Sequence, residues 1–283
     1  MPSTRIRIVT DTTSALPSDY ARAHHIEVVP QIVNFGAASF LEGVTLDYAE
    51  FIRRLKASAQ LPKTAAPQPG DLIEAYRRQL ADAPTILSIH PSAEVSGTVR
   101  SALTAKNDAF PDADIRILDS RLVAGNLASM VIAATEWAEQ GVGADEIMAR
   151  LQAMIPRGRI YFLVATLEYL QKGGRIGGAS ALIGTTLQIK PILEMRNGRV
   201  EVFEKVRTYH HALARLKELV TEQCPHSPDA HLCVMHSDDL AGARQLAGDF
   251  QSSLNARDIP IYPCSASITT HVGPGALAVG FFV

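Results

Sequence analysis

Short apolar segments alternate with longer helical patterns through the first 160 residues, and this alternation constrains the fold more than any other feature. The segments predicted as strands are Arg5–Thr10, Ile26–Val33, Thr85–Ile89, Ile115–Leu118 and Arg159–Val164. The predicted helices are Leu46–Ser58, Gly70–Leu80, Val95–Ala109, Val123–Gln140 and Ala144–Ile155. Strands that alternate with helices of about 10–15 residues indicate βαβ units, and therefore a mainly parallel, Rossmann-like sheet.

The pattern changes after residue 164. Segments Ile189–Met195 and Val200–Val206 flank Asn197-Gly198, a dipeptide that favours a tight antiparallel hairpin. Further elements are predicted, with strands at His231–His236, Ile259–Tyr262 and Ala276–Val283 and helices at Thr208–Gln223 and Ala241–Asn255. We therefore predict two α/β domains, the N-terminal one over residues 1–160 and the C-terminal one, with a mixed sheet, over residues 161–283.

The composition excludes several classes of protein. The chain has 283 residues, 47% hydrophobic and 20% charged, which is enough apolar mass for a core. Its 27 basic and 29 acidic residues are mixed along the chain, so no basic stripe for nucleic acid is expected. No apolar run approaches the roughly 18 residues of a membrane span, and the N-terminus does not resemble a signal peptide, so we expect a cytoplasmic protein.

Familiar catalytic and metal-binding motifs are missing from the sequence. It contains no Walker loop, no GxGxxG fingerprint, no GxSxG elbow and no HExxH pair. The three cysteines show no CxxC spacing and the histidines no metal-ligand spacing, so neither a disulfide framework nor a metal site is expected. We expect a binding protein without a cofactor, not an enzyme.

Two glycine-rich segments carry cationic or titratable side chains. In Leu167–Gly178, Lys172 and Arg175 lie among four glycines, and His271 precedes Gly273 and Gly275. Glycine lets the backbone approach a ligand closely, and successive backbone amides can form an anion-binding concavity. These segments suggest an anionic ligand held between them.

Three polar segments nearer the N-terminus are also candidates. Thr64 precedes the helix that begins near Gly70. Ser92 follows the predicted strand Thr85–Ile89, and Ser96 and Gly97 lie at the N-terminus of the next predicted helix. Hydroxyls and amides at a helix N-terminus can bind an anion. The polar turn after the first strand, residues 10–14, lies where open α/β sheets bind ligands. All three segments are also consistent with plain turns or helix caps.

Seven segments in the same order resemble the DegV family of bacterial fatty-acid-binding proteins. They are Val9–Pro17, Thr64 with Pro67–Asp71, Val95–Thr98, Leu118–Ser120, Leu167–Leu182, Ile189–Leu193 and His271–Leu277. The resemblance implies two α/β domains that hold a long-chain fatty acid, of C14–C18 length, at their junction. Its tail would lie in an apolar tunnel and its carboxylate near the domain junction.

The resemblance also implies roles for particular residues. Thr64, Ser96, Gly97 and His271 would bind the carboxylate. Arg175, Lys172 and Ser92 would contact a partner or the anionic head group. The partner implied is a separate fatty acid kinase, which would use ATP to convert the presented fatty acid to an acyl phosphate for phospholipid synthesis.

Two other functions fit the same residues. An enzyme acting on a small phosphorylated or carboxylated metabolite would use Lys172 and Arg175 as a clamp and His271 as acid or base. A lipid sensor or buffer would bind the fatty acid without a kinase partner.

Overall fold

The N-terminal half is built on a sheet of four parallel strands. The computed structural model describes residues 5–183 and 189–283. The strand order is β2-β1-β6-β7, with β1 at Ile6–Asp11, β2 at Glu27–Val29, β6 at Thr85–His90 and β7 at Asp114–Asp119. The associated helices are α1 (Ser18–Ala23), α3 (Pro69–Leu80), α4 (Thr98–Ala109), α5 (Ala124–Glu139) and α6 (Ala144–Met154). The predicted parallel sheet is confirmed.

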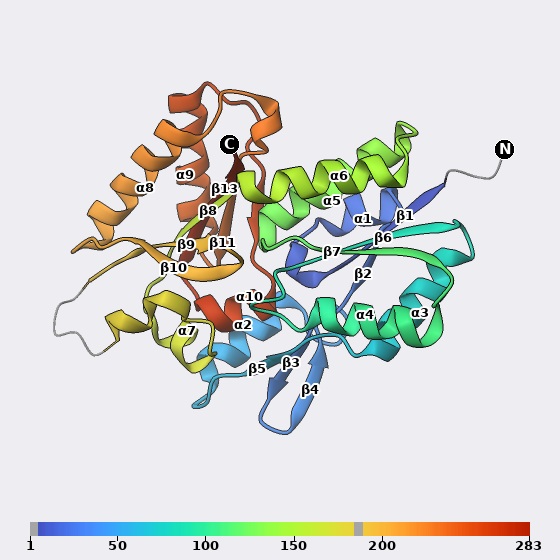
Figure 1. Ribbon diagram of the computed structural model, residues 1–283. Coiled ribbons are helices and arrows are strands. Elements are labelled where there is room, and N and C mark those ends of the chain that lie inside the picture. The colour runs from blue at the N-terminus through green and yellow to red at the C-terminus, as the bar shows by residue number, and fades with distance from the viewer. Residues whose placement is uncertain (1–4, 184–188) are drawn as a thin grey trace.

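The C-terminal half is built on a mixed sheet of six strands. Their order is β10-β9-β8-β13-β11-β12, and all neighbours are antiparallel except β11 and β12. The strands are β8 (Gly158–Leu163), β9 (Ile192–Arg196), β10 (Arg199–Glu204), β11 (Cys233–Ser237), β12 (Ile261–Pro263) and β13 (Ala276–Phe282). Helices α8 (Tyr209–Gln223) and α9 (Leu240–Leu254) pack against this sheet (Figure 1). The predicted mixed sheet and its hairpin at Asn197-Gly198 are confirmed.

A small antiparallel sheet is absent from the sequence prediction. Its order is β4-β3-β5, with β3 at Ile32–Phe35, β4 at Ala38–Leu41 and β5 at Lys63–Ala65, and α2 (Tyr48–Ala57) follows β4. The single strand predicted at residues 26–33 is wrong, because the chain leaves the parallel sheet after β2 and enters the small sheet at β3. Pro30 lies at this break, where its missing N–H removes a ladder hydrogen bond.

Helix α5 connects the two large sheets through one hydrophobic core. It contacts β1 and β6 in the parallel sheet, and β8, β11 and β13 in the mixed sheet. The largest core cluster accordingly joins Leu87 of β6, Leu127 of α5 and Phe162 of β8, all buried. Since this core crosses the expected boundary at residue 160, which falls within β8, the division into residues 1–160 and 161–283 stays a prediction.

Two short helices that the sequence analysis did not predict pack against each other beside the mixed sheet. They are α7 (Glu168–Lys172) and α10 (Ala266–Val272), which contact each other. Short 3-10 helices lie at Thr12–Ser14, Ile155–Arg157, Gly177–Leu182 and Pro228–Ala230. Among the residues described, no helix has the length and apolar character needed to cross a membrane.

Candidate functional site

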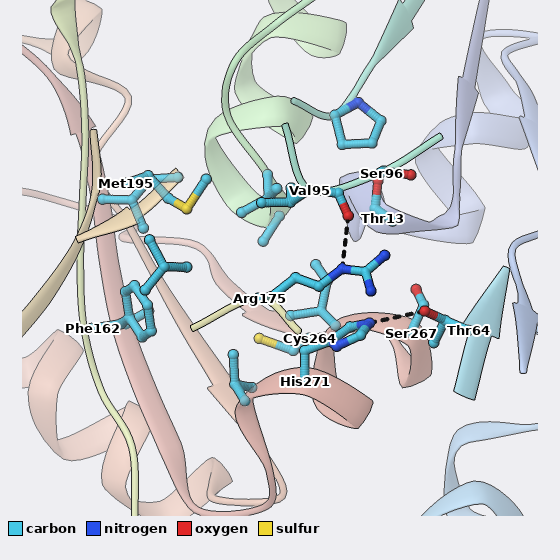
Figure 2. Close-up of a pocket in the computed structure, with 18 of the residues that line it drawn as sticks. Thr13, Thr64, Val95, Ser96, Phe162, Arg175, Met195, Cys264, Ser267 and His271 are labelled. Carbon is cyan, nitrogen blue, oxygen red and sulfur yellow. Dashed lines mark hydrogen bonds between the residues drawn. The ribbon is translucent and has the colours of Figure 1, made fainter. Parts of the chain in front are cut away.

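A cavity lies where the small sheet, α10 and the mixed sheet meet. Its atom-free volume, including its opening to solvent, is about 1010 Å³. Polar side chains line one part, and they are Thr13, Gln31, Thr64, Ser96, Arg175, Ser267 and His271. The rest is largely apolar. Figure 2 shows Phe162 and Met195 on the side opposite Ser96 and Thr64. The cavity is therefore amphipathic, with a polar end and an apolar body.

Five of the residues predicted from the sequence line this cavity. Thr64 comes from β5, Ser96 and Gly97 from the segment before α4, Arg175 from the segment after α7, and His271 from α10. Thr64 lies in a short strand and His271 in a short helix, not in turns. Long-range folding brings the five together.

Thr64 and His271 are hydrogen-bonded to each other across 2.9 Å, from Oγ1 to Nε2. Burial, assisted by the positive charge of Arg175, lowers the pKa of His271 to about 4, so its imidazole is neutral at pH 7. The other ring nitrogen, Nδ1, is buried without a partner among the described residues. An unpaired buried acceptor is better tolerated than an unpaired donor, which favours the hydrogen on Nε2. His271 then donates to Thr64, and the Thr64 hydroxyl keeps its own hydrogen for a ligand.

Arg175 supplies positive charge next to these hydroxyls. Its Nε donates to the carbonyl of Val95 at 3.1 Å and its Nη1 to the carbonyl of Gly173 at 2.8 Å. Within the described ranges Arg175 forms no ion pair with a carboxylate, so no acidic side chain described there neutralises its charge. Figure 2 shows the guanidinium directed toward the side of the cavity that carries Ser96 and Thr64. An anionic ligand is the natural counter-charge.

Lys172 and Ser92 do not line the cavity. The exposed Lys172 ammonium forms an ion pair with Glu168 one helical turn earlier in α7. The buried Ser92 hydroxyl donates to the carbonyl of Gly198 at 2.8 Å and so holds the segment before α4 against the β9–β10 hairpin. Their predicted contact with a partner or an anion stays a prediction.

Two of the glycines are explained by packing between helices α7 and α10. A Cβ on Gly173 would lie 2.3 Å from Nδ1 of His271, and one on Gly273 would lie 2.5 Å from the ring of Tyr169. Gly273 also has a positive φ of 76°. These glycines were expected to let a ligand approach, but here they let α7 and α10 pack closely and fix the position of His271.

Several polar residues of the cavity were not predicted. Gln31 is a single amide in an otherwise apolar segment, and Ser267 lies in the first turn of α10. The buried carboxyl of Glu42 accepts hydrogen bonds from the backbone N–H of Ser267, at 3.0 Å, and from its hydroxyl, at 2.9 Å. Burial raises the pKa of Glu42. Its only signal in the sequence is a lone acidic residue between Leu41 and Gly43.

The chain matches one protein family over nearly its whole length. The model of the DegV family, described as an uncharacterised protein family, matches residues 5–283. A DegV domain-containing protein of Halalkalibacterium halodurans is 33% identical over 99% of both chains. The chain belongs to the DegV family, and the predicted membership is confirmed.

Two solved structures of the family are similar along their whole length. A DegV family protein from Thermus thermophilus, described as binding a fatty acid, is 31% identical, with a TM-score of 0.90 over 98% of this chain and 99% of that one. DegV of Bacillus subtilis, described as a fatty acid binding protein, is 30% identical, with a TM-score of 0.89 over 99% and 100%. The predicted fold class is therefore confirmed by relatives as well as by topology.

Candidate metal ligands do not cluster in the part of the chain that the structure describes. No group of three or more His, Cys, Asp or Glu residues there could hold a metal ion. The three cysteines are unpaired and buried, and burial raises the pKa of Cys264 to about 12, so its thiol is protonated at neutral pH. The polar end of the cavity therefore offers hydroxyls, an amide, an imidazole and a guanidinium as ligand-binding groups.

Proposed function

We propose that this protein binds a long-chain fatty acid, with its tail in the apolar body of the cavity and its carboxylate at the polar end. The observation that carries the proposal is the hydrogen-bonded pair Thr64–His271 beside Arg175, at the polar end of a mostly apolar cavity. The fatty acids described for the two solved relatives support the same class of ligand.

The tail supplies most of the binding free energy in this proposal. A sixteen-carbon acid buries about fifteen carbons at about 0.8 kcal/mol each, an upper bound near 12 kcal/mol. Ordering the flexible chain and losing translational freedom offset several kcal/mol of this gain. The remainder is enough for a fatty acid to stay bound through purification.

The head group determines orientation. A carboxylate that leaves water must be hydrogen-bonded or paired with a cation. Thr64 and Ser96 offer hydroxyl hydrogens and Arg175 offers charge, while Gly97 keeps the backbone before α4 close to the cavity. A Cβ on Gly97 would make an ordinary van der Waals contact, 3.5 Å from Cβ of Ala66, so Gly97 contributes backbone at the cavity wall and not a steric need for glycine.

We further propose that the protein is a carrier subunit that presents the fatty acid head group to a separate, cytoplasmic, ATP-using fatty acid kinase. The half-buried Arg175 at the polar end and the exposed Lys172 nearby in the chain are the groups offered for that contact. Of the described side chains that face the cavity, the buried thiol of Cys264 is protonated, and His271, with its pKa lowered to about 4, is a weak base toward the hydroxyl of Thr64. Catalysis then belongs to the partner.

Extraction of the purified protein with organic solvent, followed by mass spectrometry, tests the proposal. We expect a C14–C18 fatty acid in near-stoichiometric amount, and rebinding of palmitic acid by the stripped protein. A protein that yields no lipid and does not bind palmitic acid would contradict it. ATP-dependent formation of acyl phosphate, on addition of a fatty acid kinase, separates a carrier from a lipid sensor or buffer.

A further inference from the structure

Gln31 lies at the polar end of the cavity within a chain of buried hydrogen bonds. Its side chain is 3% exposed and lines the cavity. The amide nitrogen Nε2 lies 3.0 Å from Oδ1 of Asp11 and 2.8 Å from Oγ1 of Thr98. Since an ionised carboxylate only accepts hydrogen bonds, the amide must turn its nitrogen toward Asp11, and its two hydrogens serve the two neighbours.

The carboxylate of Asp11 is itself held rigidly. Its Oδ2 lies 2.8 Å from Nδ1 of His90, whose Nε2 lies 2.7 Å from Oγ of Ser88, and Ser88 is hydrogen-bonded to Tyr76 at 2.8 Å. All four side chains are fully buried. The backbone N–H of Thr13 donates to Oδ1 at 3.0 Å. A buried carboxylate with this many donors is compensated, and it gives Gln31 one fixed orientation.

The orientation of Gln31 sets the direction of the next hydrogen bond. Thr98 Oγ1 accepts from Gln31, so the Thr98 hydroxyl hydrogen is available for Ser96 Oγ, 2.8 Å away. The backbone N–H of Thr98 also donates to Ser96 Oγ, at 3.3 Å. With both acceptor positions of its oxygen used, Ser96 has its own hydrogen left to donate into the cavity.

We propose that Gln31 is a positioning residue that makes the Ser96 hydroxyl a hydrogen-bond donor and so selects a ligand with an anionic head group. The inference rests on the proposed function. On the opposite side of the polar end, His271 leaves Thr64 with a hydrogen to donate in the same way. Two hydroxyls that both donate suit a carboxylate, which only accepts hydrogen bonds. They stabilise a neutral hydroxyl head group less, because their hydrogen bonds to it are not charge-assisted.

The test compares the affinities of palmitic acid and 1-hexadecanol, which share a sixteen-carbon chain. Replacing Gln31→Met keeps the side-chain length and removes both donors, so the preference for the acid should fall about tenfold, the size of one hydrogen bond to a charged group. Taking the ratio of the two affinities cancels any change in tail packing. Thr98→Val removes the intermediate hydroxyl and should have a similar effect.

Two controls separate positioning from general damage. Gln223→Met removes a glutamine that is hydrogen-bonded to Tyr161, outside the cavity, and should leave the preference unchanged. In a Ser96→Ala background, Gln31→Met should change the preference no further, because Gln31 acts through Ser96. A further tenfold loss of the preference for the acid in that background would show that Gln31 does not act through Ser96.

The remaining outcomes distinguish this inference from the proposed function. If the unmodified protein binds palmitic acid and Gln31→Met and Thr98→Val both keep its preference, only the role of Gln31 is wrong. If the unmodified protein binds neither ligand, the proposed function fails and the inference fails with it. If Gln31→Met does not fold, Thr98→Val alone tests the inference, because Thr98 does not line the cavity and cannot act on the ligand directly.

Discussion

At the scale of single residues, the charge state of His271 governs the polar end of the cavity. Burial and the neighbouring Arg175 lower its pKa to about 4, from an ordinary value of 6.5. Between these two pH values the unfolded chain binds a proton that the folded protein does not bind. Folding stability must therefore fall as the pH falls through this window.

We predict that His271→Gln removes this part of the pH dependence. Between pH 7 and pH 4 the original protein should lose up to about 3 kcal/mol more unfolding free energy than the variant, the limit set by its pKa shift. Urea unfolding at several pH values measures the difference. His226→Gln, at an exposed histidine, serves as the control and should keep the original pH dependence. Parallel pH profiles for the original protein and His271→Gln would contradict the prediction.

At the scale of elements, the packing of α7 on α10 positions His271. Gly173 ends α7 with an ordinary negative φ, so only the close approach of the His271 ring and of the carbonyl of Tyr169 restricts this position. The first turn of α10 is held from the other side by the buried Glu42. Both contacts join segments that are distant in sequence, and neither involves the ligand directly.

We predict that Gly173→Ala weakens both stability and binding. The added methyl group forces the His271 ring to move, at about 1–3 kcal/mol of unfolding free energy, and it should loosen the Thr64–His271 hydrogen bond. Thermal unfolding and palmitic acid affinity are the measurements. The matched control is Gly248→Ala in α9, where no atom lies within 4 Å of an added Cβ and the helix should gain about 1 kcal/mol. Equal behaviour of the two variants would refute this account of the packing.

At the scale of the whole molecule, the cavity is lined by the mixed sheet, the small sheet, α10 and the segments that follow the parallel strands β1, β2 and β6. Phe162 of β8 and Met195 of β9 belong to the mixed sheet, whereas Thr64 belongs to the small sheet. The polar end and the apolar body therefore come from different parts of the fold. Tail length and head group should contribute to affinity separately.

We predict that affinity rises about fourfold for each added methylene from decanoic to palmitic acid, since each buries about 0.8 kcal/mol. Ser96→Ala should lower the affinity of every acid by about the same factor, giving a parallel line in a plot of binding free energy against chain length. Isothermal titration with the acid series measures both. An affinity independent of length, or a Ser96→Ala effect confined to one length, would show that tail and head group are not separate.

Local sequence patterns predicted much of the fold and of the site. Alternation of apolar segments with helical periodicity gave the parallel sheet, and Asn197-Gly198 gave the β9–β10 hairpin. The small sheet and helices α7 and α10 were missed, because strands of three or four residues and helices of five or seven are too short to show a period. Local patterns marked the segments of Thr64, Ser96 and His271 as candidates, and the resemblance to a family implied that they bind a carboxylate, while Gln31 carried no recognisable motif.

What the sequence determined by itself is therefore what depends on neighbours along the chain: the type of each longer element, the hairpin turn, and the segments rich in glycine and hydroxyls. Only the tertiary structure decided that Thr64 meets His271, 207 positions away, and that Gln31 links Asp11 to Thr98. The physical reason is that periodicity and turn chemistry act over a few residues. Hydrogen-bond direction, burial and a shifted pKa depend on atoms that are brought together only when α10, the small sheet, the mixed sheet and the segments after the parallel strands pack around one cavity.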